Sequence, residues 1–317
     1  MEAFIHILKN VIIFVLLAIP GLILVKTKLL KNEQSSALSS LLMYVGMPFL
    51  IFSSTIGVAF SGNLIKGILI VAGIGTLIVF IFFFVLFLIF DLKKYSDELT
   101  KKKNGMIKFA IMFSNNGFLG LPLASAVFGI QSEIFIYVAA LNIITNTLIY
   151  TIGIYLISGD KKAIKAKSVL LNPVMVAFII GIIFNLLNAK NYVPEVTNYA
   201  SYLSNLVTPL SMIIMGMKLG AIKFSSLFLT SKMYIVSLLK LIVLPTIAVL
   251  FAMIFNLSNE IILGLFVAFA MPTAGLAPTI ADKYNGDTQN GVIYTLGSTI
   301  LSIFTIPVCY YLLLFVI

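Results

Sequence analysis

The sequence predicts an all-α membrane protein with ten transmembrane helices, arranged as two inverted repeats of five helices each. Three observations predict this fold class: an apolar composition, ten apolar stretches long enough to cross a bilayer, and lysines concentrated in alternate connections. Of the 317 residues, 61% are hydrophobic and 10% are charged, whereas a soluble domain carries about 25% charged residues. With a mean hydropathy of +1.13, the chain has too few polar residues to cover a water-facing surface.

The ten predicted spans follow from the lengths of the apolar stretches, because a helix needs about 20 apolar residues to cross the hydrocarbon core. The spans cover residues 4–25, 35–56, 66–90, 106–129, 133–157, 169–187, 198–219, 233–255, 260–283 and 289–315. These stretches are much longer than the strands of a membrane barrel and lack their alternation. The connections between them are too short to hold a soluble domain.

Lysines predict the orientation of the chain in the membrane. All 21 basic residues are lysines, and the net charge is +10. Sixteen of them follow the first, third, fifth, seventh and ninth spans, and only Lys66 and Lys190 lie in the alternate connections. Because cytoplasmic loops carry the excess of basic residues, we expect a multi-pass protein of the cell membrane with both termini extracytoplasmic. The same distribution argues against a nucleic-acid-binding face.

Several missing residue types limit the chemistry of the chain. Without arginine, no guanidinium is available to hold a carboxylate bidentately. The single cysteine, Cys309, excludes a disulfide within the chain and a cysteine-based metal site. No Asp or Glu lies in the middle of a predicted span, where coupled carriers often keep a carboxylate. We therefore expect no cofactor and no metal site. Coupling to Na⁺, to protons or to the membrane potential stays open.

Two segments that contain Gly and Pro indicate an internal repeat. Residues 113–122 read FSNNGFLGLP and residues 269–278 read FAMPTAGLAP, so the first Phe and the last Pro coincide at an offset of 156 residues. Each half would contain five spans, and an odd number places the halves in opposite orientations. The predicted organisation is a first repeat at 1–157, a short cytoplasmic linker at 158–168 and a second repeat at 169–317.

Both segments are predicted to interrupt their helices. The first contains two amides, two glycines and a proline, and the second contains two prolines, a glycine and a hydroxyl. Proline removes a backbone donor, glycine weakens a helix, and freed backbone groups cannot face lipid. Paired breaks in two halves predict a binding site near the bilayer midplane. Helix N-termini and uncharged donors suit a small anion there, although the same oxygens also suit Na⁺.

These motifs resemble the auxin efflux carrier family. They are the N-N-G-F-x-G-x-P element in the fourth span, the A-x-P-T-A element in the ninth, Leu171-Asn172-Pro173, and Pro209 followed by Met215-Gly216-Met217-Lys218-Leu219. The family includes bacterial permeases for malate, malonate and related organic acids, and the plant PIN-type carriers. The resemblance implies inverted repeats, crossing fourth and ninth helices, and a scaffold part separate from a transport part. This chain lacks the long central loop of the plant carriers, so auxin is unsupported as a substrate.

The predicted substrate-binding residues come from the two breaks and the fifth span. The resemblance and the break pattern select Asn115, Asn116, Gly117, Pro122, Pro272, Thr273, Ala274 and Pro278. Asn142 and Asn146, four apart on one helix face, are expected either in the cavity wall or in helix–helix hydrogen bonds. Ser298 and Ser302 match this pair at the same 156-residue offset.

Lys240, within the eighth predicted span, is ambiguous from the sequence. Its long side chain either reaches towards the membrane interface or supplies a counter-charge for an anion.

Together these patterns predict a secondary transporter of small organic anions, such as mono- or dicarboxylates, that works by alternating access. The expected partners are the anion and the lipid bilayer, with no nucleic acid, and a homodimer is left open. One alternative is a sodium-coupled bile-acid-type or cation/proton carrier on a related inverted-repeat fold, and another is a channel. An enzyme is not expected, because the spans lack clustered acidic residues and a buried pair of nucleophile and base.

Overall fold

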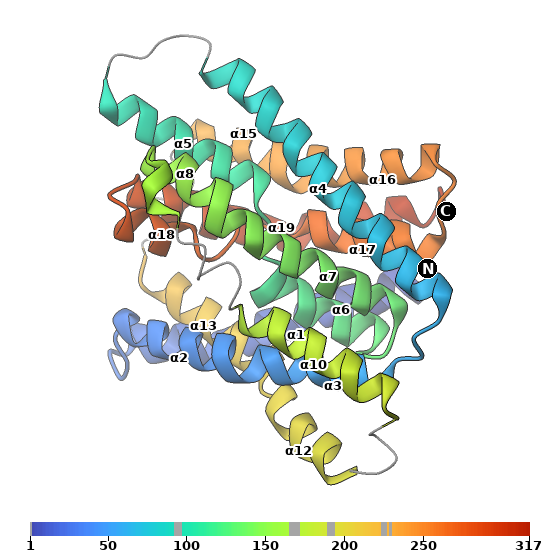
Figure 1. Cartoon of the computed structure of the whole chain (residues 1–317). Coiled ribbons are helices and arrows are strands. Elements are labelled where there is room, and N and C mark those ends of the chain that lie inside the picture. Colours follow the sequence, from blue (N-terminus) through green and yellow to red (C-terminus); the bar gives the residue numbers. More distant parts are fainter. Residues whose placement is uncertain (1, 92–96, 165–171, 189–193, 223–226, 228–229) are drawn as a thin grey trace. The chain divides into compact units, whose positions relative to one another are not determined.

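The computed structural model describes residues 2–91, 97–164, 172–188, 194–222, 227 and 230–317 (Figure 1). This part of the chain is helical and has no strand, apart from one isolated antiparallel bridge between Ser114 and Thr273. The prediction of an all-helical fold is therefore confirmed for these residues. Part of the predicted linker and of the charge pattern lies outside the described residues, namely 165–168, Lys93, Lys94, Lys165, Lys167, Lys190, Lys223 and Leu171.

Seven helical stretches of the described residues are long and apolar enough to cross a membrane. They are Ile5–Lys26, Asn32–Gly57, Gly62–Phe90, Glu133–Ser158, Pro194–Gly220, Ser231–Ile254 and Thr288–Leu313. The other three predicted spans contain the shorter apolar helices Asn116–Phe128, Pro173–Leu186 and Asn259–Ala270. Two of these three are the spans in which the sequence predicts a break, so the shortness of their helices has a local cause.

Contacts group the chain into two compact units. Unit 1 comprises Met1–Ile68, Gly117–Ala139 and Leu171–Phe224, and unit 2 comprises Leu69–Asn116, Ala140–Leu170 and Ser225–Ile317. Each unit takes segments from both predicted repeats. The units therefore describe packing, and the division into a first repeat at 1–157, a linker at 158–168 and a second repeat at 169–317 stays a prediction.

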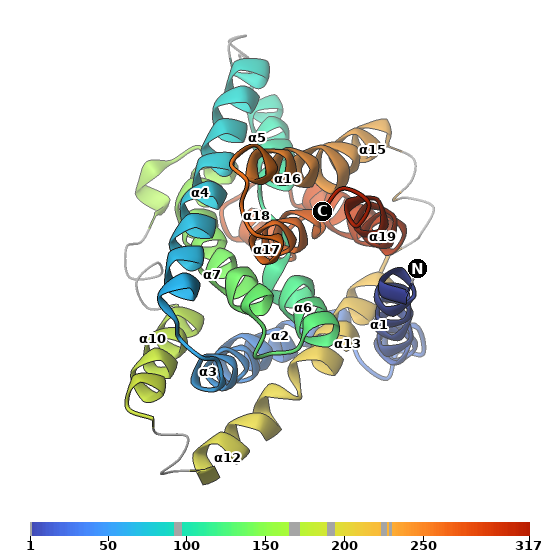
Figure 2. The ribbon, with the colours of Figure 1, turned by 90° about the vertical axis from the view of Figure 1, so that its right-hand side faces the viewer.

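Unit 1 contains most of the N-terminal helices and the helices that follow the middle of the chain. Its elements are α1 (Glu2–Lys26), η1 (Asn32–Gln34), α2 (Ser35–Leu41), η2 (Leu42–Gly46), α3 (Met47–Gly57), the start of α4 (Gly62–Phe90), most of η3 (Asn116–Gly120), α6 (Leu121–Phe128), the start of α7 (Glu133–Leu148), α10 (Pro173–Leu186), α12 (Pro194–Ser204) and α13 (Val207–Gly220). Figure 2 shows α3 beside α10, and these two helices pack closely.

Small residues allow the helices of unit 1 to approach one another backbone to backbone. A Cβ atom built on Gly21 would lie 1.9 Å from the carbonyl oxygen of Ile213, and one on Gly216 would lie 1.8 Å from that of Ala18. Glycine at both positions is what brings α1 and α13 together, as in other tightly packed membrane helices. At the end of α3, the side-chain amide nitrogen of Asn185 lies within hydrogen-bond distance of three carbonyls, those of Thr55, Ile56 and Val58.

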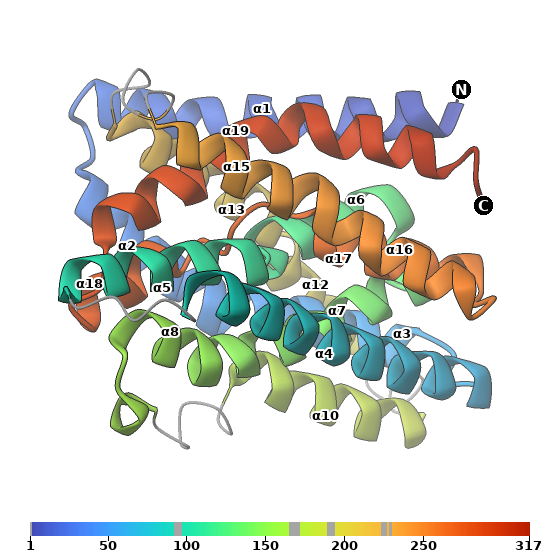
Figure 3. The ribbon, with the colours of Figure 1, turned by 90° about the horizontal axis from the view of Figure 1, so that it is seen from above.

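Unit 2 contains both helix interruptions and the C-terminal helices. Its elements are the rest of α4 and α7, α5 (Glu98–Met112), the first residue of η3, η4 (Ile149–Gly153), α8 (Ile154–Ser158), η5 (Lys161–Ala163), α15 (Ser231–Leu238), η6 (Leu239–Val243), α16 (Leu244–Ile254), α17 (Asn259–Ala270), α18 (Ala277–Lys283) and α19 (Thr288–Leu313). Figure 3 shows α15 and α16 as one continuous helical stretch with α19 alongside, and α15 contacts α19.

The helix α5 begins earlier than predicted because Asp97 caps it. The Asp97 carboxylate accepts hydrogen bonds from the hydroxyl and the backbone N–H of Thr100, and these bonds lower the pKa of Asp97 from its ordinary value. Such a cap satisfies backbone donors that have no partner within the helix. The polar first turns of α5 precede the apolar stretch, which explains why the hydropathy pattern placed the start of this span at residue 106.

Three wide π-turns each precede a proline. The π-helices η2, η3 and η6 end two residues before Pro48, Pro122 and Pro245 respectively. A proline ring clashes with the carbonyl four residues before it, and in each case that carbonyl belongs to the π-turn. Widening the turn by one residue accommodates the ring without breaking the helix.

Candidate functional site

The candidate site lies in unit 2, where two helices are interrupted side by side. The first helix, α5, ends at Met112, and the chain is not helical again until η3 begins at Asn116. The second, α17, ends at Ala270, and α18 begins at Ala277. Both interruptions fall within the segments for which the sequence predicts them, so this part of the prediction is confirmed.

Backbone hydrogen bonds join the two interruptions. The N–H of Asn115 donates to the carbonyl of Pro272 at 2.8 Å, and the N–H of Ala274 donates to the carbonyl of Phe113 at 2.9 Å. Ser114 and Thr273 form the antiparallel bridge between these two bonds. The breaks thus satisfy part of each other's freed backbone groups, which is how a membrane protein tolerates irregular backbone away from water.

Thr273 anchors the second break to two neighbouring helices. It is fully buried. Its N–H donates to the Ser298 hydroxyl at 3.1 Å, and its own hydroxyl donates to the Ala110 carbonyl at 2.9 Å. The Thr273 hydroxyl proton, predicted as a donor to substrate, is therefore engaged within the protein in this structure. Ser298, which the repeat pattern singled out, lies against the break, and its partner Ser302 donates to the carbonyl of Thr299 on its own helix.

Three buried asparagines supply the unsatisfied polar atoms of the site. Asn115, Asn116 and Asn142 are each 3% exposed or less. Among the described residues, Asn115 Nδ2, Asn116 Oδ1 and Asn142 Nδ2 have no hydrogen-bond partner. Leaving a buried polar group unpaired costs about 1–3 kcal/mol, so three such atoms in one unit lower the stability of the unliganded protein. They are two donors and one acceptor that a bound ligand or water would satisfy.

The fifth predicted span contributes a short polar row to this site. Asn116 Nδ2 donates to the Thr145 hydroxyl across a long 3.5 Å, and Asn146 Nδ2 donates to Asn142 Oδ1 at 3.3 Å. Thr145 and Asn142 lie three residues apart and so share one face of α7. Asn142 and Asn146 are among the residues predicted from the sequence, and Thr145 is not, although its spacing from Asn142 places it on the same helix face.

Gly275 leaves room next to Asn115. A Cβ atom built on Gly275 would lie 3.5 Å from both amide atoms of Asn115. The N–H of Ala274 is already bonded to the Phe113 carbonyl across the break, so this donor is not available to a ligand. Pro278 opens α18 and is packed against Gly291 of α19.

Two of the predicted site residues belong to unit 1. Gly117 lies in η3 and Pro122 lies in the first turn of α6, where its carbonyl accepts a hydrogen bond from the Ser125 hydroxyl. In the same unit, the Lys218 ammonium lies 5.7 Å from the ring centroid of Phe118. These residues shape the continuation of the first broken helix.

Lys240 is a residue of this site that the sequence left undecided. It is completely buried, and its ammonium donates to the Ser114 hydroxyl and to the Phe269 carbonyl. The interpretation in which its side chain reaches towards the membrane interface is therefore wrong. A lone charged residue in the middle of an apolar stretch was the available signal, since such a residue is usually functional. Ser114, which directly precedes the paired asparagines, was also missed.

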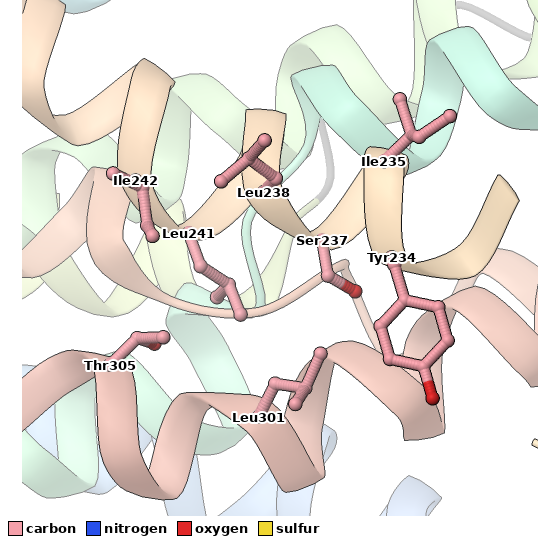
Figure 4. A pocket seen from close by; sticks show the side chains of 8 residues that line it. All are labelled: Tyr234, Ile235, Ser237, Leu238, Leu241, Ile242, Leu301 and Thr305. Atoms are coloured by element: carbon pink, nitrogen blue, oxygen red, sulfur yellow. The ribbon is translucent and has the colours of Figure 1, made fainter. Parts of the chain in front are cut away.

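A separate apolar cleft of about 350 Å³ lies in the same unit (Figure 4). It is lined by Tyr234, Ile235, Ser237, Leu238, Leu241, Ile242, Leu301 and Thr305. Figure 4 shows the side chains of α15 and η6 on one side and Leu301 and Thr305 of α19 on the other. The cleft contains none of the predicted site residues, and its polar groups are hydroxyls only. It offers no charge that would hold an anion.

Comparison with known proteins agrees with the family resemblance. A family model described as "Membrane transport protein" matches residues 6–310. An uncharacterized transporter of Methanocaldococcus jannaschii is 28% identical over 82% of this chain and 84% of its own length. Another, from Methanothermobacter thermautotrophicus, is 27% identical over 94% of this chain and 96% of its own. An uncharacterized transporter of Escherichia coli is 26% identical over 62% of this chain and 63% of its own.

Proposed function

Because this chain belongs to the membrane transport protein family, that is, the auxin efflux carrier family, we propose that it is a secondary carrier of small organic anions. Mono- and dicarboxylates are the proposed substrates, bound where the two interrupted helices meet. The proposed mechanism is alternating access, in which the site opens to one face of the membrane at a time. Chemical conversion of the substrate forms no part of this proposal.

The observation that carries the proposal is the set of unsatisfied buried amide atoms beside the breaks. Asn115 Nδ2 and Asn142 Nδ2 are donors, and a carboxylate accepts several hydrogen bonds. Hydrogen bonds to a charged group contribute about 1.5–3 kcal/mol each, enough to offset the cost of keeping these donors unpaired in the empty site. Asn116 Oδ1 is an acceptor and would suit a hydroxyl or a protonated carboxyl group of the same substrate.

The charge balance of unit 2 supports an anion. Lys240 is buried beside the breaks. The ion pairs of the described residues are Lys102 with Glu98 and Lys108 with Asp91, and neither includes Lys240. A buried ammonium is costly to keep charged without a compensating charge, so a ligand that brings a negative charge would stabilise the charged form of Lys240.

The finer architecture is part of the same proposal. We propose that the ten predicted spans form two inverted five-helix repeats, with the fourth and ninth crossing at the bilayer midplane. Unit 2 would be the transport part, because it contains the paired breaks, and unit 1 would be the scaffold. The lysine pattern supports cytoplasmic odd connections and extracytoplasmic termini.

Uptake by reconstituted proteoliposomes tests the proposal. Purified protein would be reconstituted and supplied with radiolabelled malate, malonate, lactate and benzoate, each in competition with the unlabelled acid. Saturable uptake of at least one acid, above that of protein-free vesicles, is the expected result. Uptake of none of them above that background would contradict the proposed substrate class, and a rate that does not saturate would indicate a channel.

A further inference from the structure

The ammonium group of Lys240 contacts both interrupted helices. Its Nζ donates to the hydroxyl of Ser114 in the first break and to the carbonyl of Phe269, at 3.3 Å, in the last turn of α17 before the second. The residue is completely buried. An ammonium has three N–H donors, so these two bonds leave one for a further oxygen.

The backbone places Lys240 through a π-turn. Lys240 is the second residue of η6, the π-helix that precedes Pro245. One extra residue in a helical turn changes the direction in which the following side chains point, and such turns are frequent at functional sites. The proline that widens the turn is thus also part of what directs this lysine to the breaks.

The oxygens around Lys240 are of the kind that hold a coupling cation in carriers with broken helices. In such carriers, Na⁺ is bound by carbonyls at the C-terminal ends of half-helices and by unwound backbone. The Phe269 carbonyl belongs to such a helix end, where the helix dipole is negative, and Ser114 belongs to an unwound segment. The Lys240 ammonium therefore already contacts two oxygens of the kinds that such carriers use to hold Na⁺.

We propose that Lys240 is a resident cation that takes the place of a bound Na⁺ between the two helix breaks, so that this protein binds its anion without a metal cation. The claim about Na⁺ rests on the geometry of Lys240, and only the claim about anion binding rests on the proposed function. If it holds, the sodium-coupled alternative that the sequence left open does not apply. The positive charge that compensates the anion then belongs to the protein itself.

Binding of ²²Na⁺ to purified protein tests the proposal without any knowledge of the substrate. Four variants would be compared with the unaltered chain, and one of them, Ser114→Ala, removes the hydroxyl that contacts Lys240. Lys240→Met keeps the length of the side chain and removes its charge. Lys240→Ala empties the space beside Ser114. Lys232→Met is the matched control, because Lys232 is an exposed lysine on the same helical stretch.

The unaltered protein and Lys232→Met are expected to retain no ²²Na⁺ beyond that of a protein-free control. Lys240→Ala is expected to gain ²²Na⁺ that unlabelled Na⁺ displaces, and Lys240→Met, which fills the space, is expected not to. Two results would overturn the proposal: ²²Na⁺ retained by the unaltered protein and lost in Ser114→Ala, or no ²²Na⁺ in Lys240→Ala that is shown to be folded by its thermal unfolding.

Uptake of the radiolabelled acids in NaCl and in choline chloride gives the second readout. The unaltered protein is expected to take up substrate equally in both salts, and Lys240→Met is expected to lose uptake in both. A requirement for Na⁺ in the unaltered protein, which needs no variant to detect, would overturn the proposal, as would normal uptake by Lys240→Met. If no acid is taken up in either salt, the proposed function fails and the ²²Na⁺ result alone decides the role of Lys240.

Discussion

The backbone N–H of Asn115 donates a hydrogen bond to the carbonyl of Pro272 at 2.8 Å. This bond joins the interruption of α5 to the interruption of α17 and makes them one structural element. The bond fixes the backbone position of Asn115. The side-chain nitrogen of the same residue, Nδ2, has no hydrogen-bond partner among the described residues. The site therefore has a fixed polar group that the fold itself does not use.

Replacing Asn116 by alanine is expected to reduce uptake at least about tenfold, the effect of losing one hydrogen bond of about 1.4 kcal/mol to the substrate. The same change removes a buried unpaired oxygen and also the long hydrogen bond to Thr145, so the unfolding temperature of the unliganded protein is expected to change little. Asn63→Ala, at an exposed position, is the control and should change neither. A lower unfolding temperature together with normal uptake would mean that Asn116 is a packing residue.

Replacing Pro272 by alanine supplies the backbone N–H that proline lacks. Because alanine also favours the helix, the second break is expected to shorten. Transport should then be weak or absent, whereas the amount of protein in the membrane should be normal. Pro20→Ala offers a comparison, because Pro20 is an exposed proline inside the continuous helix α1. Equal uptake by the two variants would count against the breaks as the site.

Gly216→Ala is expected to destabilise the protein because its methyl group would collide with the carbonyl of Ala18. Such a clash costs about 1–3 kcal/mol when the backbone has to move. Gly73→Ala is the matched change, since no atom lies within 4 Å of a Cβ built there, and it should be neutral or slightly stabilising. Thermal unfolding in detergent measures both, and equal midpoints would show that α1 and α13 do not pack through Gly216.

The lysine pattern predicts which loops face the cytoplasm. In a background where the only cysteine is replaced (Cys309→Ser), Thr27→Cys should react with a membrane-impermeant maleimide only after the cells are opened. Asn256→Cys, in an alternate connection, should react in intact cells. The opposite labelling of the two positions would reverse the proposed orientation and with it the extracytoplasmic termini.

A membrane potential should drive a monoanion through this protein if no other ion moves with it. A potential of about 100 mV supplies about 2.3 kcal/mol per charge, which corresponds to about a fiftyfold gradient. Proteoliposomes with an imposed K⁺ diffusion potential and valinomycin measure the accumulated acid. Accumulation that responds only to a pH gradient would show that the substrate's own proton, and not the voltage, provides the driving force.

The helix breaks could be predicted from the sequence because their cause is local. Proline and glycine act on their own turn of the helix, and the residues 113–122 and 269–278 contain several of them. The burial of Lys240 could not be predicted in the same way. Its environment is made by Ser114 and Phe269, which lie far from it in the chain, and the apolar pattern around it fits a buried or an interfacial side chain equally well.

The residues of the site also differ in whether they could be predicted from the sequence. Asn115, Asn116 and Asn142 were predictable because an amide side chain is rare in an apolar membrane helix and usually has a function there, whatever its partners are. Thr145 and Ser298 are small hydroxyl residues of a kind common in membrane helices, so their role emerges only from their contacts. Span limits were predicted least well for α5, where a polar start capped by Asp97 precedes the apolar stretch.

Ligand-induced stabilisation is the most direct test of an anion site at the paired breaks. The unfolding temperature of the purified protein would be measured with a panel of dicarboxylates, monocarboxylates and aromatic acids at constant ionic strength, in the unaltered chain and in Asn115→Ala and Asn116→Ala. One class of acid is expected to raise the unfolding temperature of the unaltered protein, and both substitutions are expected to abolish the rise. A rise that persists in both variants would place the anion elsewhere and contradict an anion site at the paired breaks.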